Sequence, residues 1–108
     1  MRPGWGVSIR EARPVGTKPA IRRTVWYSGR VQGVGFRFTA CTIARRFAVA
    51  GYVKNLPDGR VEAAIEGAPE EVERFLSAIR EEMTGHIRDE RQEDSAARGD
   101  CSEFSVRY

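Results

Sequence analysis

A glycine-rich segment that ends in an arginine is the part of this sequence best suited to bind a charged ligand. It reads GRVQGVGFR and spans Gly29–Arg37, with further glycines at positions 33 and 35. Glycine adopts positive φ at little cost, so successive backbone N–H groups of such a loop can point toward one anion. The guanidinium of Arg37 adds a planar fork of donors that matches phosphate oxygens. The residue types therefore predict an anion-binding loop closed by one arginine.

A helical pattern follows the loop and strengthens this interpretation. Apolar residues recur at helical spacing at Phe36, Ala40, Ile43 and Phe47. The first turn of a helix offers unpaired N–H groups and the positive end of the helix dipole. Arg37 in that turn opposes the dipole, and a bound anion would remove the conflict.

Other phosphate-binding loops fit the segment poorly. A dinucleotide fingerprint that begins at Gly33 fails because Phe38 stands where its third glycine is required, and the chain has no Gly-Lys-Ser/Thr of a nucleotide triphosphate loop. A cysteine phosphatase needs a thiolate at the start of the loop, whereas Cys41 lies beyond it. We interpret Cys41 as a small packing residue on the helix.

Strand and helix patterns alternate in the remainder of the chain. The predicted strands cover residues 22–28, 48–55, 59–67, 86–94 and 103–108. The second and third of them form a hairpin, because Leu56–Gly59 has turn chemistry. A second helix begins at Pro69 and carries a periodic apolar face of Val72, Phe75, Leu76, Ile79 and Met83. The strand at 86–94 has Ile87 as its one strongly apolar residue, which predicts an exposed edge strand.

The order of these elements is βαββαβ plus a last strand, which predicts an α+β fold with two helices on one face of an antiparallel sheet. In this split βαβ arrangement the first and second strands run parallel and are separated by the third. The loop after the first strand and the turn after the second then emerge at the same end of the sheet. Arg37 and Asn55, the last residue of the second strand, are therefore expected to be neighbours.

Composition is that of an ordinary soluble single-domain protein. The chain has 108 residues, of which 41% are hydrophobic and 31% charged, and a formal net charge of +3 with both signs interleaved. That balance favours a small anionic ligand about as much as a nucleic acid. Residues 1–21, with several prolines and glycines, predict a flexible tail, and residues 22–108 a single domain. Because no apolar run suits a bilayer span or a secretion signal, a cytoplasmic protein is expected.

Cysteine and histidine are too few to predict a metal centre. Cys41, Cys101 and the single His86 cannot supply four zinc ligands without carboxylates, so no metal is expected. The two cysteines are expected to be free thiols in a reducing compartment, and a disulfide between them stays open. His86 is interpreted as an ordinary residue at the start of a strand.

Taken together, the segments GRVQGVGFR, GYVKNLPDGRV and FSVRY resemble the acylphosphatase family, and the similarity covers about residues 22–108. The resemblance implies a ferredoxin-like α/β sandwich and an enzyme that hydrolyses acyl phosphates to a carboxylate and inorganic phosphate without metal or cofactor. By position, it implies that Arg37 binds the phosphate and that Asn55 holds the attacking water. The implied phosphate cradle is the backbone of Arg30, Val31, Gln32, Gly33, Val34, Gly35 and Phe36. The implied partner is a small acyl phosphate rather than nucleic acid or membrane, and a monomer is expected.

Two other functions stay open at the level of sequence. The same fold can hold an anion without turnover, as acylphosphatase-like domains do within larger carbamoyl-transfer maturation proteins, although a length of 108 residues argues against the fused version. RNA is a second alternative, because Trp26 alternates with Val25 and Tyr27 on what is expected to be an open sheet face. The run GVGFRF faintly resembles an RNA-recognition motif, but it lies in a loop that opens a helix. The charged segment Glu82–Asp100 departs from the family pattern and leaves the bounds of the fourth strand open.

Overall fold

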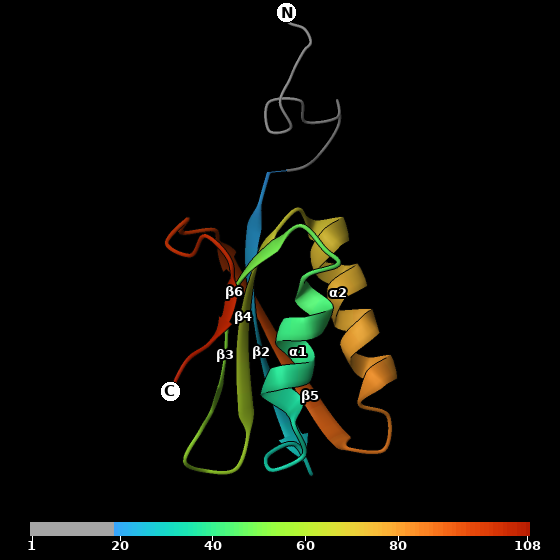
Figure 1. The fold of residues 1–108 in the computed structure, drawn as a ribbon. Helices are drawn as coiled ribbons and strands as arrows, with labels where there is room; N and C mark the ends of the chain where they lie inside the picture. Colours follow the sequence, from blue (N-terminus) through green and yellow to red (C-terminus); the bar gives the residue numbers. More distant parts are fainter. Residues whose placement is uncertain (1–18) are drawn as a thin grey trace, which may run out of the picture.

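Two helices pack against one face of a five-stranded sheet in the computed structural model, which describes residues 19–108 (Figure 1). The strands are β2 (Ile21–Gly29), β3 (Val49–Asn55), β4 (Val61–Gly67), β5 (Ile87–Ala96) and β6 (Phe104–Val106). The helices are α1 (Phe36–Ala44) and α2 (Pro69–Glu82). Almost all of the expected tail, residues 1–21, lies outside the described residues, so its flexibility stays a prediction.

The strand order β5-β2-β4-β3-β6 is that of the predicted split arrangement. β4 runs antiparallel to both β2 and β3, so those two strands are parallel to each other and separated by it. β6 pairs in parallel with β3, which makes the sheet mixed rather than wholly antiparallel as expected. The loop after β2 and the turn after β3 leave the same end of the sheet, at the bottom of Figure 1. The predicted ferredoxin-like α+β fold is confirmed.

The core lies between the sheet and the helices, and the period of each element decides which residues enter it. Val25 and Tyr27 alternate along β2 and are fully buried. The buried face of α2 repeats at helical spacing and contains Val72, Phe75, Leu76 and Ile79, as predicted. Burial of these apolar side chains is the main favourable term that holds the helices on the sheet.

The first helix is shorter than its apolar pattern predicts. Its inner face is Phe36, Ala40 and Ile43, which are buried as expected. The helix ends at Ala44, so Phe47 lies beyond it and not on it. The ring of Phe47 nevertheless reaches the core, where its centre lies 6.2 Å from that of Phe75. Apolar spacing alone does not separate a helical residue from a loop residue that folds back onto the same core.

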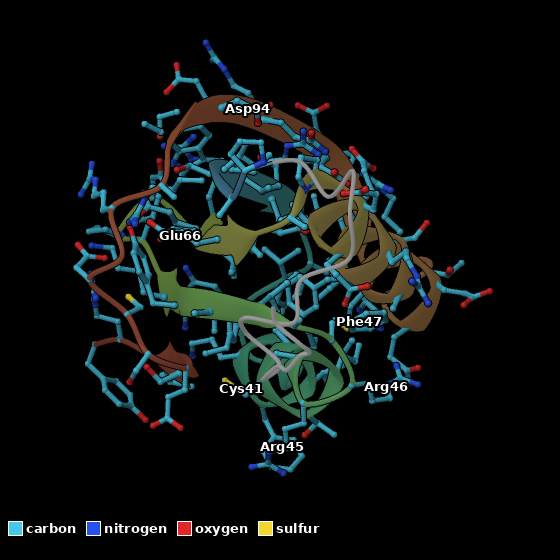
Figure 2. All side chains as sticks on the ribbon, turned by 90° about the horizontal axis from the view of Figure 1, so that it is seen from above. Cys41, Arg45, Arg46, Phe47, Glu66 and Asp94 are labelled. Carbon is cyan, nitrogen blue, oxygen red and sulfur yellow. The ribbon has the colours of Figure 1, made fainter. Side chains whose placement is uncertain are left out.

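The polar strand β5 is the edge strand that its composition predicts. It pairs with β2 alone and most of its side chains are exposed. Arg23 of β2 binds Asp94 through two hydrogen bonds of 2.6 and 3.0 Å, near the top of Figure 2. Arg80 of α2 binds Glu90 at 2.9 Å. These ion pairs attach a strand with little apolar surface to its neighbours.

The sheet face opposite the helices does not suit an RNA strand. Glu62 lies between the two large aromatic residues of this face, accepting hydrogen bonds from Trp26 Nε1 at 3.0 Å and from the Tyr52 hydroxyl at 2.7 Å. Arg107 covers the ring of Tyr52, with its Cζ 4.0 Å from the ring centre. RNA-binding sheets offer uncovered aromatic rings for base stacking, and a carboxylate between them repels the phosphate backbone. This geometry disfavours the RNA alternative.

A buried ion pair on the same face fixes the loop that leads to β6. Arg22 is 4% exposed and Glu66 is 7% exposed, and their side chains meet at 2.8 Å. The Glu66 carboxylate, labelled in Figure 2, also accepts hydrogen bonds from the backbone amides of Arg98 at 2.9 Å and Gly99 at 3.0 Å. One carboxylate therefore joins β2 and β4 to the segment between β5 and β6.

Replacing Glu66 with alanine is expected to lower the free energy of unfolding by about 3–5 kcal/mol, because the change leaves a buried guanidinium without its partner. Burial alone would raise the pKa of Glu66, but the two amides and Arg22 outweigh it and hold the pKa below its usual value of 4.5. A carboxyl group with a lowered pKa stabilises the fold above its unfolded pKa and loses that effect as the pH falls. Urea unfolding at several pH values should therefore show a parent-to-variant difference that shrinks on acidification.

The matched control for this prediction is Glu93→Ala, which removes an exposed carboxylate from β5. This variant is expected to change the free energy of unfolding by no more than about 0.5 kcal/mol at every pH. A Glu66→Ala difference that stays constant down to acid pH would contradict the role assigned to the ionised carboxylate.

Candidate active site

The loop between β2 and α1 is anchored at both ends and exposed between them. Val31 and Phe36 are buried, and the ring of Phe36 lies 4.9 Å from the ring of Tyr27. Gly33 and Gly35 both have φ of +78°, a left-handed conformation that side-chain-bearing residues rarely adopt. Gly35 is also the N-cap of α1 and provides no side-chain cap. The loop therefore turns sharply onto a helix whose first N–H groups are left without a side-chain partner.

Gly29 has a different role from the two glycines inside the loop. Its φ is +125°, and a Cβ at this position would lie 2.4 Å from the carbonyl oxygen of His86. The register of β2 against β5 shifts between Ser28 and Gly29, which brings the two backbones together here. The requirement for glycine at this position therefore comes from close strand packing.

The same close packing removes one donor from the predicted phosphate cradle. The backbone N–H of Arg30 donates to the carbonyl oxygen of His86 at 2.9 Å. Within residues 19–108, the amides from Val31 to Phe36 donate no well-formed hydrogen bond to another part of the protein. Of the predicted cradle, Arg30–Phe36, the Arg30 N–H is therefore already bonded within the protein, and the role of the loop in phosphate binding stays a prediction.

Arg37 extends its guanidinium beside this loop with its donors uncommitted. The side chain is half-buried, and no ion pair joins it to a carboxylate among the described residues. Its Cζ lies 5.2 Å from the ring centre of Tyr108, a distance at which the ring quadrupole attracts the cation. An arginine held near unpaired amides without an anionic partner is an arrangement that favours an anionic ligand.

Asn55 reaches the same place from the end of β3, as the topology predicts. A cleft of about 320 Å³ is lined by Val31, Gly33, Gly35, Phe36, Arg37, Phe38, Cys41, Asn55, Val106 and Tyr108. Arg37 is the one charged side chain in this lining, so the electrostatic preference of the cleft is for an anion. The structure thus brings the two side chains named from the sequence to one cleft.

Gln32 has a structural role that sequence reasoning missed. Its side-chain Nε2 donates to the carbonyl oxygens of Leu56 at 2.8 Å and Arg60 at 2.9 Å. These carbonyls belong to the turn that follows β3, so one side chain attaches the glycine-rich loop to the segment that carries Asn55. A glutamine among glycines gives no sequence signal for such a bridge, because both acceptors are backbone atoms.

The two cysteines are free, so the disulfide that the sequence left open is not formed in the structure. Cys41 is half-buried and packs against the core, on the side of α1 that borders the cleft. Figure 2 shows Arg45, the residue directly after the end of α1, pointing away from the fold. Burial raises the pKa of the Cys41 thiol, and the charge of Arg45 offsets this only in part. A raised pKa disfavours the thiolate that a nucleophile needs, which agrees with the packing role.

Neither a metal cluster nor a membrane helix is found in the described part of the chain. Within residues 19–108, no three histidine, cysteine, aspartate or glutamate residues are grouped so that they could hold a metal ion. None of the helices there is long and apolar enough to span a bilayer.

Comparison with known proteins identifies the family. The acylphosphatase family profile matches residues 23–106. An acylphosphatase of Gloeobacter violaceus is 52% identical over 62 residues, which are 57% of this chain and 67% of the relative. One from Thermococcus kodakarensis is 60% identical over 56 residues, or 52% and 62% of the two chains. The crystal structure of acylphosphatase from Bacillus subtilis superimposes with a TM-score of 0.75 at 32% identity, covering 82% of this chain and 99% of that one. With this match over most of its length, the chain belongs to the acylphosphatase family of enzymes.

Proposed function

We propose that this chain hydrolyses acyl phosphates to a carboxylate and inorganic phosphate, with Arg37 and the loop amides binding the phosphoryl group and Asn55 positioning the water. The observation that carries the proposal is the meeting of unpaired loop amides, an uncommitted guanidinium and a carboxamide at one cleft with no other charged side chain. The proposed cleft is at the low end of the roughly 300–1,000 Å³ of small-molecule sites, which suits a compact substrate.

Phosphate binding is assigned to the backbone of Val31–Phe36 together with Arg37. The amides supply several donors, and the uncapped start of α1 adds the positive end of its dipole. The guanidinium can donate two parallel hydrogen bonds to phosphate oxygens. These groups are in place before substrate arrives, so they stabilise charge on the transferring phosphoryl group with little reorganisation.

Water positioning is assigned to the carboxamide of Asn55. An amide side chain is neutral and cannot take a proton as a base, but its oxygen accepts and its NH2 donates a hydrogen bond. Water attacks phosphorus, the new O–P bond forms, and the bond from phosphorus to the acyl oxygen breaks with its electron pair leaving on the carboxylate. The proton of the attacking water passes to a phosphate oxygen.

The proposed reaction needs no general acid, because a carboxylate is a good leaving group. The enzyme then lowers the barrier mainly by positioning the reacting groups and stabilising charge, as is usual in phosphoryl transfer. A site made of an arginine, an asparagine and backbone amides is sufficient for this chemistry. No resident metal or cofactor is part of the proposal.

The direct test is hydrolysis of benzoyl phosphate by the parent protein in the presence of a chelator. We expect saturable release of benzoate and phosphate, with competitive inhibition by inorganic phosphate. Binding of phosphate without any turnover would favour the alternative of an anion-binding module. Loss of all activity on chelation would contradict the metal-independent mechanism.

A Gln32→Ala variant is expected to lower kcat/KM for benzoyl phosphate by about tenfold, because loosening a positioning contact misaligns the groups it holds. The side chain bridges the loop to the turn after β3, so its loss lets Arg37 and Asn55 move relative to each other. Steady-state kinetics should show the loss mainly in kcat. The matched control is Gln92→Ala on β5, which removes an exposed amide and is expected to leave the kinetics unchanged. If Gln32→Ala and Gln92→Ala had the same kcat and kcat/KM, the positioning role of Gln32 would be wrong.

We also propose that the protein acts as a cytoplasmic monomer. In support of the monomer, the exposed large hydrophobic side chains in the described part of the chain are Val34, Phe38 and Tyr108, all at or beside the cleft. Away from the cleft, residues 19–108 therefore expose no large hydrophobic side chain that could form the centre of a stable subunit interface. Light scattering of the purified protein measures the mass in solution.

A further inference from the structure

In the described part of the chain, the large exposed hydrophobic side chains lie at or beside the cleft. Among residues 19–108, the large hydrophobic side chains that stay exposed are Val34 at 40%, Phe38 at 75% and Tyr108 at 98%. Phe38 and Tyr108 line the cleft, and Val34 lies between the two glycines that line it. Single exposed hydrophobic residues are common, but a cluster around one cleft marks a place where apolar surface is covered on binding.

The residues that line the cleft divide into a polar group and an apolar group, called here its polar half and its apolar half. The glycine-rich loop, Arg37 and Asn55 form the polar half. The apolar half is formed by Phe38 and Cys41 of α1 together with Val106 of β6 and Tyr108. Cys41 belongs to this half as an apolar group, because it is half-buried against the core and burial raises the pKa of its thiol. A phosphoryl group can form hydrogen bonds with the polar half but gains no favourable contact from the apolar half.

These two halves border the same cleft. Arg37 and Phe38 both line the cleft, so a group attached to an arginine-bound phosphate lies within reach of the phenyl ring. The cleft lining contains no acidic side chain and no basic side chain besides Arg37, so a further charged group on the substrate would lose water without gaining a charged side chain as partner. An apolar group would instead cover the exposed rings.

We propose that Phe38, Cys41, Val106 and Tyr108 form the acyl-group subsite and that Phe38 is a specificity-determining residue. The favoured substrates are acyl phosphates with a compact apolar acyl group, aromatic or branched, rather than acetyl phosphate or one with a charged acyl chain. The inference rests on the proposed function, since it assigns the other half of the same cleft. A cleft of about 320 Å³ has room for a phosphoryl group that carries a single ring.

The test compares benzoyl and acetyl phosphate in the parent, in Phe38→Ser and in Thr42→Ala. Phe38→Ser removes a ring that is 75% exposed, so folding is not at risk. We expect kcat/KM for benzoyl phosphate to fall by about tenfold, chiefly through KM, and that for acetyl phosphate by about twofold, as for a lost apolar contact. Thr42 is exposed one turn further along α1 and outside the cleft lining, so its variant should match the parent on both substrates. Equal losses on the two substrates, or no loss, would overturn the subsite.

A binding experiment separates this inference from the proposed function. Benzoylphosphonate and acetylphosphonate carry a carbon–phosphorus bond and are not hydrolysed, so calorimetry reports binding whether or not the protein turns over acyl phosphates. The subsite predicts tighter binding of benzoylphosphonate to the parent and a smaller preference in Phe38→Ser. If neither acyl phosphate is hydrolysed but this preference is found, the proposed function fails and the subsite stands. Equal affinity of the two phosphonates for the parent would reject the subsite alone.

Discussion

Replacing Arg37 with alanine is expected to lower kcat/KM for benzoyl phosphate by about 10³-fold, the scale seen when a single charge-stabilising group is removed from a phosphoryl or acyl transfer site. The guanidinium is the one charged side chain that lines the cleft, and no ion pair engages it within the described residues. In the proposed mechanism, its loss leaves the loop amides to hold the phosphoryl group alone. Because the arginine is proposed to bind both the ground state and the transition state, KM should rise and kcat should fall together.

Two further variants show whether the planar geometry of the guanidinium or its positive charge accounts for the expected loss of activity. Arg37→Lys keeps the charge and loses the planar fork, so it should recover only part of the activity. Arg45→Ala removes a cation that points away from the fold at the C-terminal end of α1, and it should behave like the parent (Figure 2). If Arg45→Ala lost as much activity as Arg37→Ala, general attraction of anions by a basic surface would explain the data, and the assignment of Arg37 would be wrong.

Replacing Asn55 with alanine is expected to lower kcat by about 10²-fold, in the range for one preorganised hydrogen-bonding group, with KM changed little. The carboxamide is proposed to hold the water and not the substrate, so substrate binding should survive. Stopped-time assays at saturating benzoyl phosphate measure kcat directly, and inhibition by inorganic phosphate reports whether the anion site is intact. Retention of near-normal kcat would remove the water-positioning role.

Asn55→Asp is the informative companion variant, because it keeps the shape and one acceptor while adding a negative charge. Repulsion between the new carboxylate and the phosphoryl group should raise KM, which Asn55→Ala should not do. The two variants together separate positioning of water from electrostatic effects on substrate. An unchanged KM in Asn55→Asp would place Asn55 too far from the phosphoryl group for its proposed role.

The sequence predicted the meeting of Arg37 and Asn55 because it depends on topology alone. Once β2 and β3 are parallel strands separated by β4, the loop after one and the turn after the other must leave the same end of the sheet. The glycines of the segment and the arginine at its end identified the loop. The catalytic roles of both side chains stay predictions, which the variants above test.

Contacts between segments that are distant in the chain could not be predicted from the sequence. The amide of Arg30 is taken by His86 because the register shift near Gly29 brings the β5 backbone against the loop. Gln32 acts through two carbonyl acceptors, and no pattern in the chain marks a carbonyl as an acceptor. The pairing of Arg22 with Glu66 was likewise unpredicted, since strand alternation indicates the face of a residue and not its partner.

The proposed phosphate cradle is tested most directly by titrating the isotope-labelled protein with inorganic phosphate while amide chemical shifts are recorded by NMR. We predict saturable shifts concentrated in the backbone amides of residues 31–36, with the same residues responding far more weakly in Arg37→Ala. Shifts that are absent, or that centre on another part of the chain, would contradict the phosphate site on which the proposed mechanism depends.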